Sequence, residues 1–230
     1  MTREASQRPT GTRGGQLGSE APQGAGTREA DIWISGHLRS MIQMRQAMNG
    51  VPEGYNYLCM EDFVIDRGQF MVPNYLTDDE LELVTNSVER AASYFNCSCY
   101  TKECYYNAQV LAMINPEFVY HEGYANAITP MLHAWVTLNG KVIDVTWRNS
   151  GATPLGERTS IPLGEDGDDL DERRLGGFGE RVTYCGVAFT SEQLLEHIDL
   201  DHGGPMIDRW EDGWPVLKME RISPLPEKKD

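Results

Sequence analysis

The sequence is short of basic residues, long apolar runs and cysteine, and each shortage excludes a class of protein. Only 20 lysine and arginine residues stand against 35 acidic ones, and the resulting net charge of -15 argues against nucleic acid as a partner. No apolar run approaches the roughly 18–20 residues of a membrane-spanning helix, so no membrane segment is expected. Five cysteines in 230 residues indicate no disulfide framework, which favours free thiols in a reducing, cytoplasmic setting.

The N-terminal stretch also lacks large apolar side chains. Residues 1–30 are rich in Gly, Ser, Thr, Gln and Pro, bury too little surface to offset the entropy of ordering, and are predicted to be disordered. Arg3, Arg8 and Arg13 are followed by no apolar segment, so a secretory signal is not expected. Residues 31–230 are long enough to bury one sizeable core and are expected to form a single domain.

Two segments in the first half have the apolar periodicity of helices. Residues 31–50 place apolar side chains on one face and end at an Asn-Gly pair, which predicts a helix. Thr77 and Glu80 form a capping-box signature before a second helix that runs to Phe95. Between them, residues 51–73 have an irregular apolar pattern that indicates short strands or a packed loop.

The second half begins with an acidic segment. Residues 149–180 are rich in Gly, Pro, Asp and Glu and are predicted to be a solvated loop, because the carboxylates of residues 165–172 lack the register of a calcium-binding loop. Residues 181–189 predict a strand and residues 191–200 a capped helix. The last 30 residues indicate an extended segment that wraps over the domain.

The segment 104–147 holds the residue types that a thiol nucleophile needs. Thr101 is a suitable N-cap, which would place Cys104 in the first turn of a helix that ends at Asn115-Pro116. A thiol in the first turn lies near the positive end of the helix dipole and near unpaired backbone N–H groups, and both favour the reactive thiolate. The same N–H groups can hold the oxyanion of a tetrahedral intermediate.

A hairpin follows this helix. Asn139-Gly140 between two apolar runs predicts a two-residue turn that pairs Trp135 with Asp144 and His133 with Thr146. The His133 and Asp144 side chains then share one face of the hairpin, where a carboxylate can orient an imidazole through its ring N–H. The opposite, apolar face is expected to face the core. It comprises Ala134, Val136, Leu138, Ile143, Val145 and Trp147.

The order of these elements resembles the transglutaminase-like branch of the papain-like cysteine enzymes. In that family a cysteine opens a helix, a Gly-Tyr pair ends the next strand, a His-Ala-Trp triplet follows, and an aspartate lies in the adjoining strand. The matching residues here are Cys104, Gly123-Tyr124, His133-Ala134-Trp135 and Asp144. The chain departs from the pattern at Lys102 and Val145, where the family often has glycine and proline.

The resemblance implies an α+β fold of the papain/transglutaminase-like kind, with an antiparallel sheet packed against the helix that carries the cysteine. It implies Cys104 as nucleophile, His133 as general base and acid, and Asp144 as the residue that orients His133. The substrate would be a protein, a peptide or a small amide or ester, with hydrolysis favoured over transfer to an amine and no cofactor or metal required. Candidate residues of the substrate cleft are Trp135, Tyr124, Tyr100 and Asn96.

Two other classes of function stay open. One is a binding module that keeps the fold without activity. The other is an interaction protein stabilised by zinc, although the cysteine spacing matches no standard structural zinc pattern. Its ligands would be Cys97, Cys99, Cys104 and His121. A metal site at His197 and His202, which lie close to Asp199 and Asp201, is disfavoured against a solvated helix end.

Overall fold

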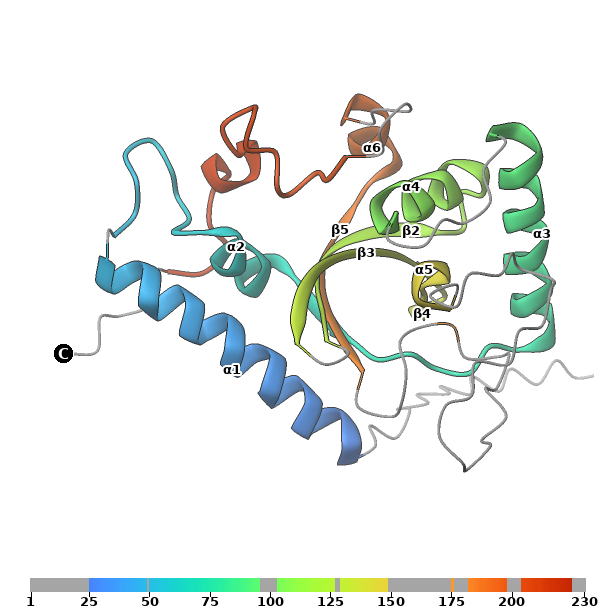
Figure 1. The fold of residues 1–230 in the computed structure, drawn as a ribbon, viewed down its shortest axis with the longest axis horizontal. Coiled ribbons are helices and arrows are strands. Elements are labelled where there is room, and N and C mark those ends of the chain that lie inside the picture. The colour runs from blue at the N-terminus through green and yellow to red at the C-terminus, as the bar shows by residue number, and fades with distance from the viewer. Residues whose placement is uncertain are drawn as a thin grey trace, which may run out of the picture.

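The computed structural model describes residues 25–48, 50–95, 103–126, 129–148, 175, 182–197 and 204–224. The strands are β1 (Gln69–Met71), β2 (Val119–Asn126), β3 (Pro130–Leu138), β4 (Lys141–Ile143) and β5 (Thr183–Phe189). The helices are α1 (Ala25–Met48), α2 (Met60–Arg67), α3 (Asp78–Phe95), α4 (Cys104–Ile114), α5 (Val145–Arg148), α6 (Ser191–His197) and the 3-10 turn η1 (Pro215–Lys218). Together they make a mixed α+β fold around one curled sheet (Figure 1).

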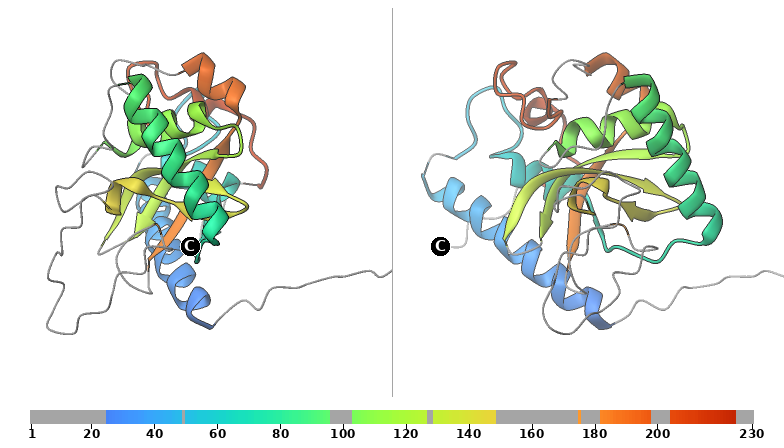
Figure 2. Two further views of the ribbon diagram at one scale, coloured as in Figure 1. Left: turned by 90° about the vertical axis from the view of Figure 1, so that its right-hand side faces the viewer. Right: turned by 45° about the vertical axis from the view of Figure 1, so that its right-hand side comes forward.

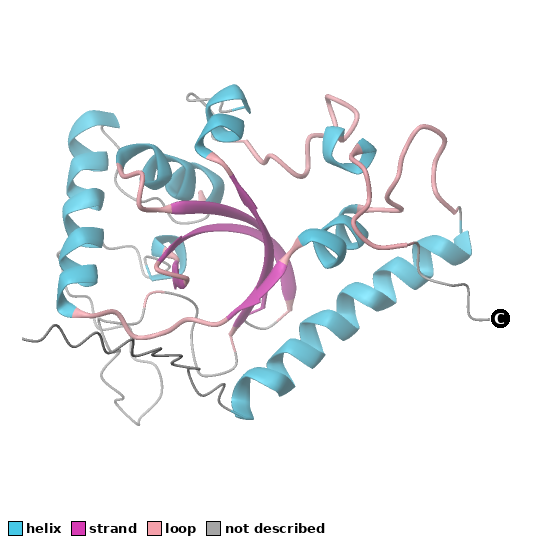
Figure 3. Ribbon diagram, turned by 180° about the vertical axis from the view of Figure 1, so that it is seen from behind, coloured by secondary structure: helices cyan, strands magenta, loops and turns pink. Residues whose placement is uncertain are grey.

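The sheet has the strand order β1-β5-β2-β3-β4, and every neighbouring pair is antiparallel. Seen from behind, its strands curve as one band, with α1 and α2 toward one end and α3 and α4 toward the other (Figure 3). Helix α4 packs on β2 and β3, and α3 lies against α4 (Figure 2). This antiparallel sheet packed against the Cys104 helix confirms the coarse fold expected from the sequence.

The two faces of the sheet are both buried, each in its own apolar cluster. The main core lies on the face of Tyr120 and Val136, where residues of α1 to α4 pack against the sheet. A smaller cluster on the opposite face is built around Trp135 and Tyr184. On this side a Cβ on Gly186 would come within 2.4 Å of the Trp135 ring, so the missing side chain gives the indole its space.

Helix α3 confirms the strongest helix of the sequence, including its capping box. The Thr77 N–H donates to the Glu80 carboxylate (2.8 Å), and the Glu80 N–H donates to the Thr77 hydroxyl (3.2 Å). Helix α1 is also present, but it begins at Ala25, within the stretch predicted to be disordered. Residues 1–24 lie outside the described part of the chain.

Helix α2 corrects the prediction of short strands or a packed loop for residues 51–73, of which only β1 is a strand. The helix has eight residues, too few turns for a periodic pattern to stand out. Its start is fixed by a side chain, because Asp62 accepts a hydrogen bond from the Leu58 N–H (3.0 Å). Phe63 and Val64 then bury one side of the helix in the main core.

The hairpin confirms the turn but not the full length of the second strand. Asn139 and Gly140 have the positive φ angles of a two-residue turn, 52° and 76°. Strand β4 nevertheless ends at Ile143, so the predicted pairs of Trp135 with Asp144 and His133 with Thr146 do not form. The Asp144 carboxylate instead caps α5, accepting hydrogen bonds from the N–H groups of the second and third helical residues at 3.0 and 3.3 Å.

Turning into α5 also moves Trp147 away from its expected place. The alternation of a continuous strand would put this indole on the main-core face. In the structure it packs against the smaller cluster, on the side of Trp135 and Tyr184. The prediction for Trp147 was therefore wrong because the strand ends at Ile143, four residues before it.

The C-terminal region contains the predicted strand and the start of the predicted helix. Strand β5 begins at Thr183, and α6 follows after Thr190, which shares a capping box with Gln193 (2.9 and 3.2 Å). The final described segment, 204–224, runs back across the domain to α2, as an extended wrap should. It is held there by the Arg221 guanidinium, which binds the buried Asp62 carboxylate with two hydrogen bonds of 2.6 and 3.1 Å.

The predicted acidic loop at 149–180 lies outside the described residues, apart from the buried Leu175. Among the helices that are described, none combines the length and apolar character needed to cross a membrane.

Candidate active site

Cys104 is the first residue of α4, and the helix N-cap is Glu103. Cys104 therefore lies in the first turn of the helix, as predicted, although the cap is Glu103. Thr101, the predicted cap, lies outside the described residues. The helix ends as predicted, with the Asn115 N–H bonded to the Leu111 carbonyl (3.1 Å). The thiol is therefore close to the N–H groups at the positive end of the helix dipole.

His133 on β3 and Asp144 at the start of α5 form a direct pair. The His133 Nε2 lies 2.7 Å from the Asp144 Oδ2, and both side chains are buried. Asp144 has no proton to give when ionised, so Nε2 carries the hydrogen and donates it. The other ring nitrogen, Nδ1, is then the one left for the thiol of Cys104.

The Cys104 side chain is close enough to His133 to act on the ring through a hydrogen bond and through its charge. The three predicted residues thus meet in the order thiol, imidazole, carboxylate. The hairpin register alone does not determine which element the His133 face contacts, and in the structure that element is α4.

The electrostatics favour a protonated imidazole. Burial lowers the pKa of His133, but the charge and hydrogen bond of Asp144, reinforced by Cys104, outweigh it and raise that pKa to about 10. At neutral pH the ring is then an imidazolium. A positive charge beside a thiol stabilises the thiolate, which is the nucleophilic form.

A hydrogen bond between helices holds the thiol in place. The Asn107 side chain, one turn after Cys104, donates to the Thr146 hydroxyl of α5 (2.9 Å). Because α5 is capped by Asp144, this bond ties the cysteine helix to the carboxylate end of the site. Asn107 and Thr146 are both buried, so the tie is shielded from water.

Two aromatic residues that the sequence analysis did not select complete the surroundings. Trp147 stacks on the His133 ring with centroids 4.4 Å apart and planes 23° apart. Tyr184 of β5 donates its hydroxyl hydrogen to Asp144 Oδ2 (2.9 Å). Aspartate is a common helix N-cap, so reading Asp144 as a cap would have predicted α5 and with it the position of Trp147 beside His133. Nothing in the pattern of residues 181–189 indicates the contact of Tyr184 with Asp144.

The residues predicted to line the cleft are placed differently. Trp135 is 1% exposed, stacks on His121 (5.8 Å) and contacts Tyr184 (4.9 Å), so it offers no surface for a substrate. Tyr124 is buried in the main core, where burial and a hydrogen bond to Glu61 raise its pKa far above the usual value. Tyr100 and Asn96, the other two candidates, lie outside the described residues.

The proposed zinc ligands are not brought together in the part of the chain that is described. His121 is buried on β2 with its Nε2 3.1 Å from the Thr137 hydroxyl, and burial lowers its pKa to about 4. Cys97 and Cys99 are outside the described residues. No group of three or more metal-ligating side chains occurs among the residues that are placed.

The second proposed metal site, at the end of α6, is only partly described. His197 lies on the surface with its Nδ1 2.6 Å from the Arg209 guanidinium, whose charge disfavours a cation there. Asp199, Asp201 and His202 lie outside the described residues.

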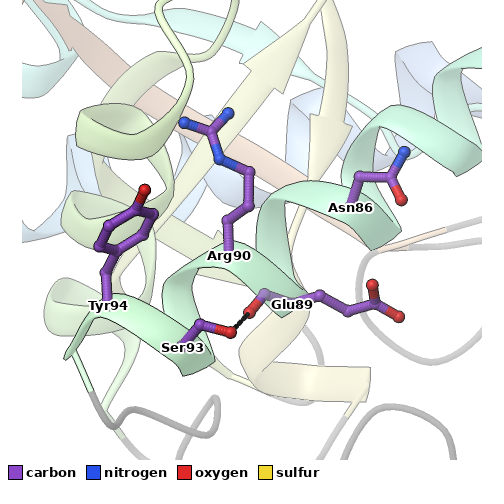
Figure 4. A pocket seen from close by; sticks show the side chains of 5 residues that line it. All are labelled: Asn86, Glu89, Arg90, Ser93 and Tyr94. Carbon is purple, nitrogen blue, oxygen red and sulfur yellow. Dashed lines mark hydrogen bonds between the residues drawn. The ribbon is translucent and has the colours of Figure 1, made fainter.

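An open hollow of about 490 Å³ lies on the exposed side of α3, away from this site (Figure 4). All its described lining residues project from that one helix, and the Ser93 hydroxyl donates to the Glu89 carbonyl within it (3.0 Å). The lining residues are Asn86, Glu89, Arg90, Ser93 and Tyr94. They include no nucleophile paired with a base.

A buried thiol–imidazole–carboxylate chain at a helix N-terminus can perform nucleophilic catalysis on a carbonyl group. No family model, curated protein or solved structure matches the chain.

Proposed function

We propose that the protein is a cysteine-dependent acyl-transfer enzyme of the papain/transglutaminase-like kind, acting on an amide or ester bond. The observation that supports this is the contact of Cys104, at the start of α4, with a His133 ring that is bound to Asp144 (2.7 Å). A nucleophile, a base and a group that orients the base are the three parts such chemistry needs.

In the first half-reaction the Cys104 thiolate attacks the carbonyl carbon and forms a tetrahedral intermediate. The hydrogen bonds of α4 begin with the Asn107 N–H and the Glu103 carbonyl (2.9 Å), so the N–H groups of Cys104 and Tyr105 precede the first helical bond. These groups can stabilise the oxyanion. As the C–N or C–O bond breaks, His133 gives its proton to the leaving group, and a thioester remains on Cys104.

In the second half-reaction water or an amine attacks the thioester. His133 accepts the proton of the attacking molecule, and the Cys104 thiolate leaves, so the site returns to its starting charges. Hydrolysis remains the favoured outcome, with a protein, peptide or small amide or ester as substrate. The chemistry is carried by side chains alone, and a cytoplasmic location is consistent with the free thiols of Cys59 and Cys104.

The test measures alkylation of Cys104 by iodoacetamide at pH 6 and pH 8. Trypsin isolates this cysteine, because no lysine or arginine lies between Lys102 and Lys141 and no other cysteine lies in that stretch. The ratio of the two rates cancels the effect of limited access to a buried thiol. An ordinary thiol slows about 100-fold from pH 8 to pH 6, whereas a thiolate paired with imidazolium slows only a few-fold.

A second readout asks for acyl chemistry itself. An activated ester such as p-nitrophenyl acetate should leave an acetyl group on Cys104, detectable by mass spectrometry of the same tryptic peptide. An ordinary alkylation ratio together with no acetyl-enzyme would overturn the proposal and leave the binding module as the function of this fold.

A further inference from the structure

The Asp144 carboxylate is shared between two tasks, one for each oxygen. Oδ1 caps α5 by accepting backbone N–H groups. Oδ2 accepts two side-chain hydrogens, one from His133 Nε2 at 2.7 Å and one from the Tyr184 hydroxyl at 2.9 Å. The site oxygen therefore divides its negative charge between the imidazole and a phenol from a strand distant in sequence.

The Tyr184 ring is held in place by its neighbours. It is fully buried, with centroids 4.9 Å from Trp135, 5.7 Å from Trp147 and 6.3 Å from His133. Gly186, two residues further on β5 and on the same face, leaves the space that the Trp135 ring occupies. A ring enclosed in this way delivers its hydroxyl to one place, so the bond to Asp144 is preorganised.

We infer that Tyr184 is a positioning residue of the site, whose hydroxyl orients the Asp144 carboxylate and limits how strongly that carboxylate raises the basicity of the His133 ring. The inference rests on the proposed acyl-transfer function for its catalytic meaning. Its physical content, a coupling between Tyr184 and His133 through Asp144, is independent of any substrate.

The coupling follows from competition for one oxygen. Two donors on a single carboxylate oxygen each reduce the charge that the other meets. Without the hydroxyl, the imidazolium would be the one remaining side-chain donor to Oδ2 among the described residues, and the stronger interaction would make it a weaker acid. A general acid that binds its proton too tightly gives it up slowly to a leaving group, so Tyr184 keeps His133 usable in the first half-reaction.

The groups that face the pair come from three elements. Cys104 approaches His133 from α4, Tyr184 approaches Asp144 from β5, and the neutral Trp147 of α5 covers the ring. Of these, Cys104 and Tyr184 are titratable, and Cys104 is the one whose charge acts directly on His133. A change in the titration of His133 can therefore be assigned once the state of the thiol is controlled.

The experiment compares Tyr184→Phe with Tyr120→Phe. Both tyrosines are buried, and both donate a hydroxyl hydrogen to a buried carboxylate, but Tyr120 donates to Glu122 (2.5 Å), away from the site. The ring of Tyr184 is retained, so the aromatic packing is preserved. His133 is titrated by NMR of ring-labelled histidine from pH 7 to pH 11, with Cys104→Ala as the common background and His133→Gln to assign the signal.

Tyr184→Phe should raise the midpoint of the His133 titration by about one pH unit, and Tyr120→Phe should leave it within the error of measurement. An unchanged or lowered midpoint in Tyr184→Phe overturns the inference, as does an equal shift in both variants. If Tyr184→Phe does not fold, 3-fluorotyrosine introduced at position 184 replaces it. That more acidic phenol donates more strongly and should lower the His133 midpoint. A midpoint that is not lowered would also overturn the inference.

This test fails separately from that of the proposed function. The titration needs neither the thiol nor turnover, so a shift in Tyr184→Phe stands even if wild-type Cys104 alkylates like an ordinary thiol. Conversely, Cys104 can alkylate like a paired thiolate while Tyr184→Phe leaves the His133 midpoint unchanged. That result would support the proposed enzyme function and exclude only the positioning role of Tyr184.

Discussion

Two cysteines of this chain stand at helix N-termini and are equally buried. Cys59 is the N-cap of α2, Cys104 is the first residue of α4, and each is 8% exposed. The partial positive charge of a helix start is available to both. Their neighbours differ. The first turn of α2 holds Glu61 and Asp62, whereas α4 has no acidic residue in its first turn after the Glu103 cap, and Cys104 contacts His133.

The consequence for Cys59 is a thiol that stays protonated. Burial, followed by the charge and hydrogen bond of Glu61, raises its pKa to about 12. Cys104 meets an imidazolium instead. A helix N-terminus alone therefore does not make a nucleophile, because a neighbouring full charge outweighs the helix dipole.

The largest expected effect separates the two thiols by substitution. Cys104→Ser should reduce turnover of an activated ester by more than about 1000-fold, since a hydroxyl beside the same imidazole is a far weaker nucleophile near neutral pH. Cys59→Ser, the matched change at the other helix, should retain at least half of the wild-type rate. Steady-state assays with p-nitrophenyl acetate measure both, and comparable losses in the two variants would contradict the assignment of Cys104.

The next change should make Cys104 behave like Cys59. In His133→Gln the thiol loses its counter-charge, so its alkylation at pH 6 should fall about 100-fold relative to pH 8. His121→Gln is the control, because His121 is also buried on this face of the sheet but contacts Trp135 instead. The measurement is the pH ratio of iodoacetamide labelling, and the expectation fails if both histidine variants give the wild-type ratio.

The His133 pair should also make stability depend on pH. The pKa of this histidine is raised to about 10 in the folded protein, so its contribution is complete below the unfolded value near 6.5 and is lost as pH rises through 10. The loss between pH 7 and pH 11 should be on the order of 2–4 kcal/mol. Urea unfolding of the wild type and His133→Gln across this range gives the difference, and parallel curves would exclude the linkage.

A smaller effect is expected when the helix carrying Cys104 is loosened. Asn107→Ala removes the hydrogen bond to Thr146 and leaves its hydroxyl buried, at a cost of about 1–3 kcal/mol of unfolding free energy. Because α4 is then free to shift relative to Asp144, ester turnover should fall about 10-fold. Asn56→Ala, at an exposed asparagine far from the site, serves as the control. A stability loss without a loss of turnover would show that the bond does not position the thiol.

The smallest effect is expected at Cys59. Glu61→Gln removes the charge that adds to burial but keeps a hydrogen-bonding side chain, so the thiolate fraction of Cys59 at pH 9 should rise a few-fold. Alkylation of the tryptic peptide that contains Cys59 measures it. Labelling that remains unchanged would assign the protonated state of Cys59 to burial alone.

The parts of the site that the sequence predicted are those fixed by short-range rules. Asn139-Gly140 sets the pairing of β3 with β4, and this pairing brings His133 near Asp144 within a dozen residues. The start of α4 at Cys104 is likewise a local feature, although its cap is Glu103 instead of Thr101. Such features need no knowledge of the rest of the fold.

The features that were not predicted have two causes. Some depend on contacts between distant segments, and one depends on a local sequence that is compatible with both a strand and a helix. Residues after Asp144 alternate like a strand, and only the capping bonds of its carboxylate decide for a helix. Tyr184 reaches the site across the sheet, 40 residues further along the chain. Trp135 was predicted to line the substrate cleft, but it is buried because Gly186 leaves room for its ring.

The double duty of Asp144 bears on how related chains should be compared. An aspartate that starts a helix is kept for folding whether or not the site is used, so its presence in a homologue says little about activity. Neither Cys104 nor the Tyr184 hydroxyl takes part in capping α5. In a related chain without the proposed acyl-transfer activity, both residues could change while the aspartate is retained, so the two positions taken together should report on activity better than the aspartate does.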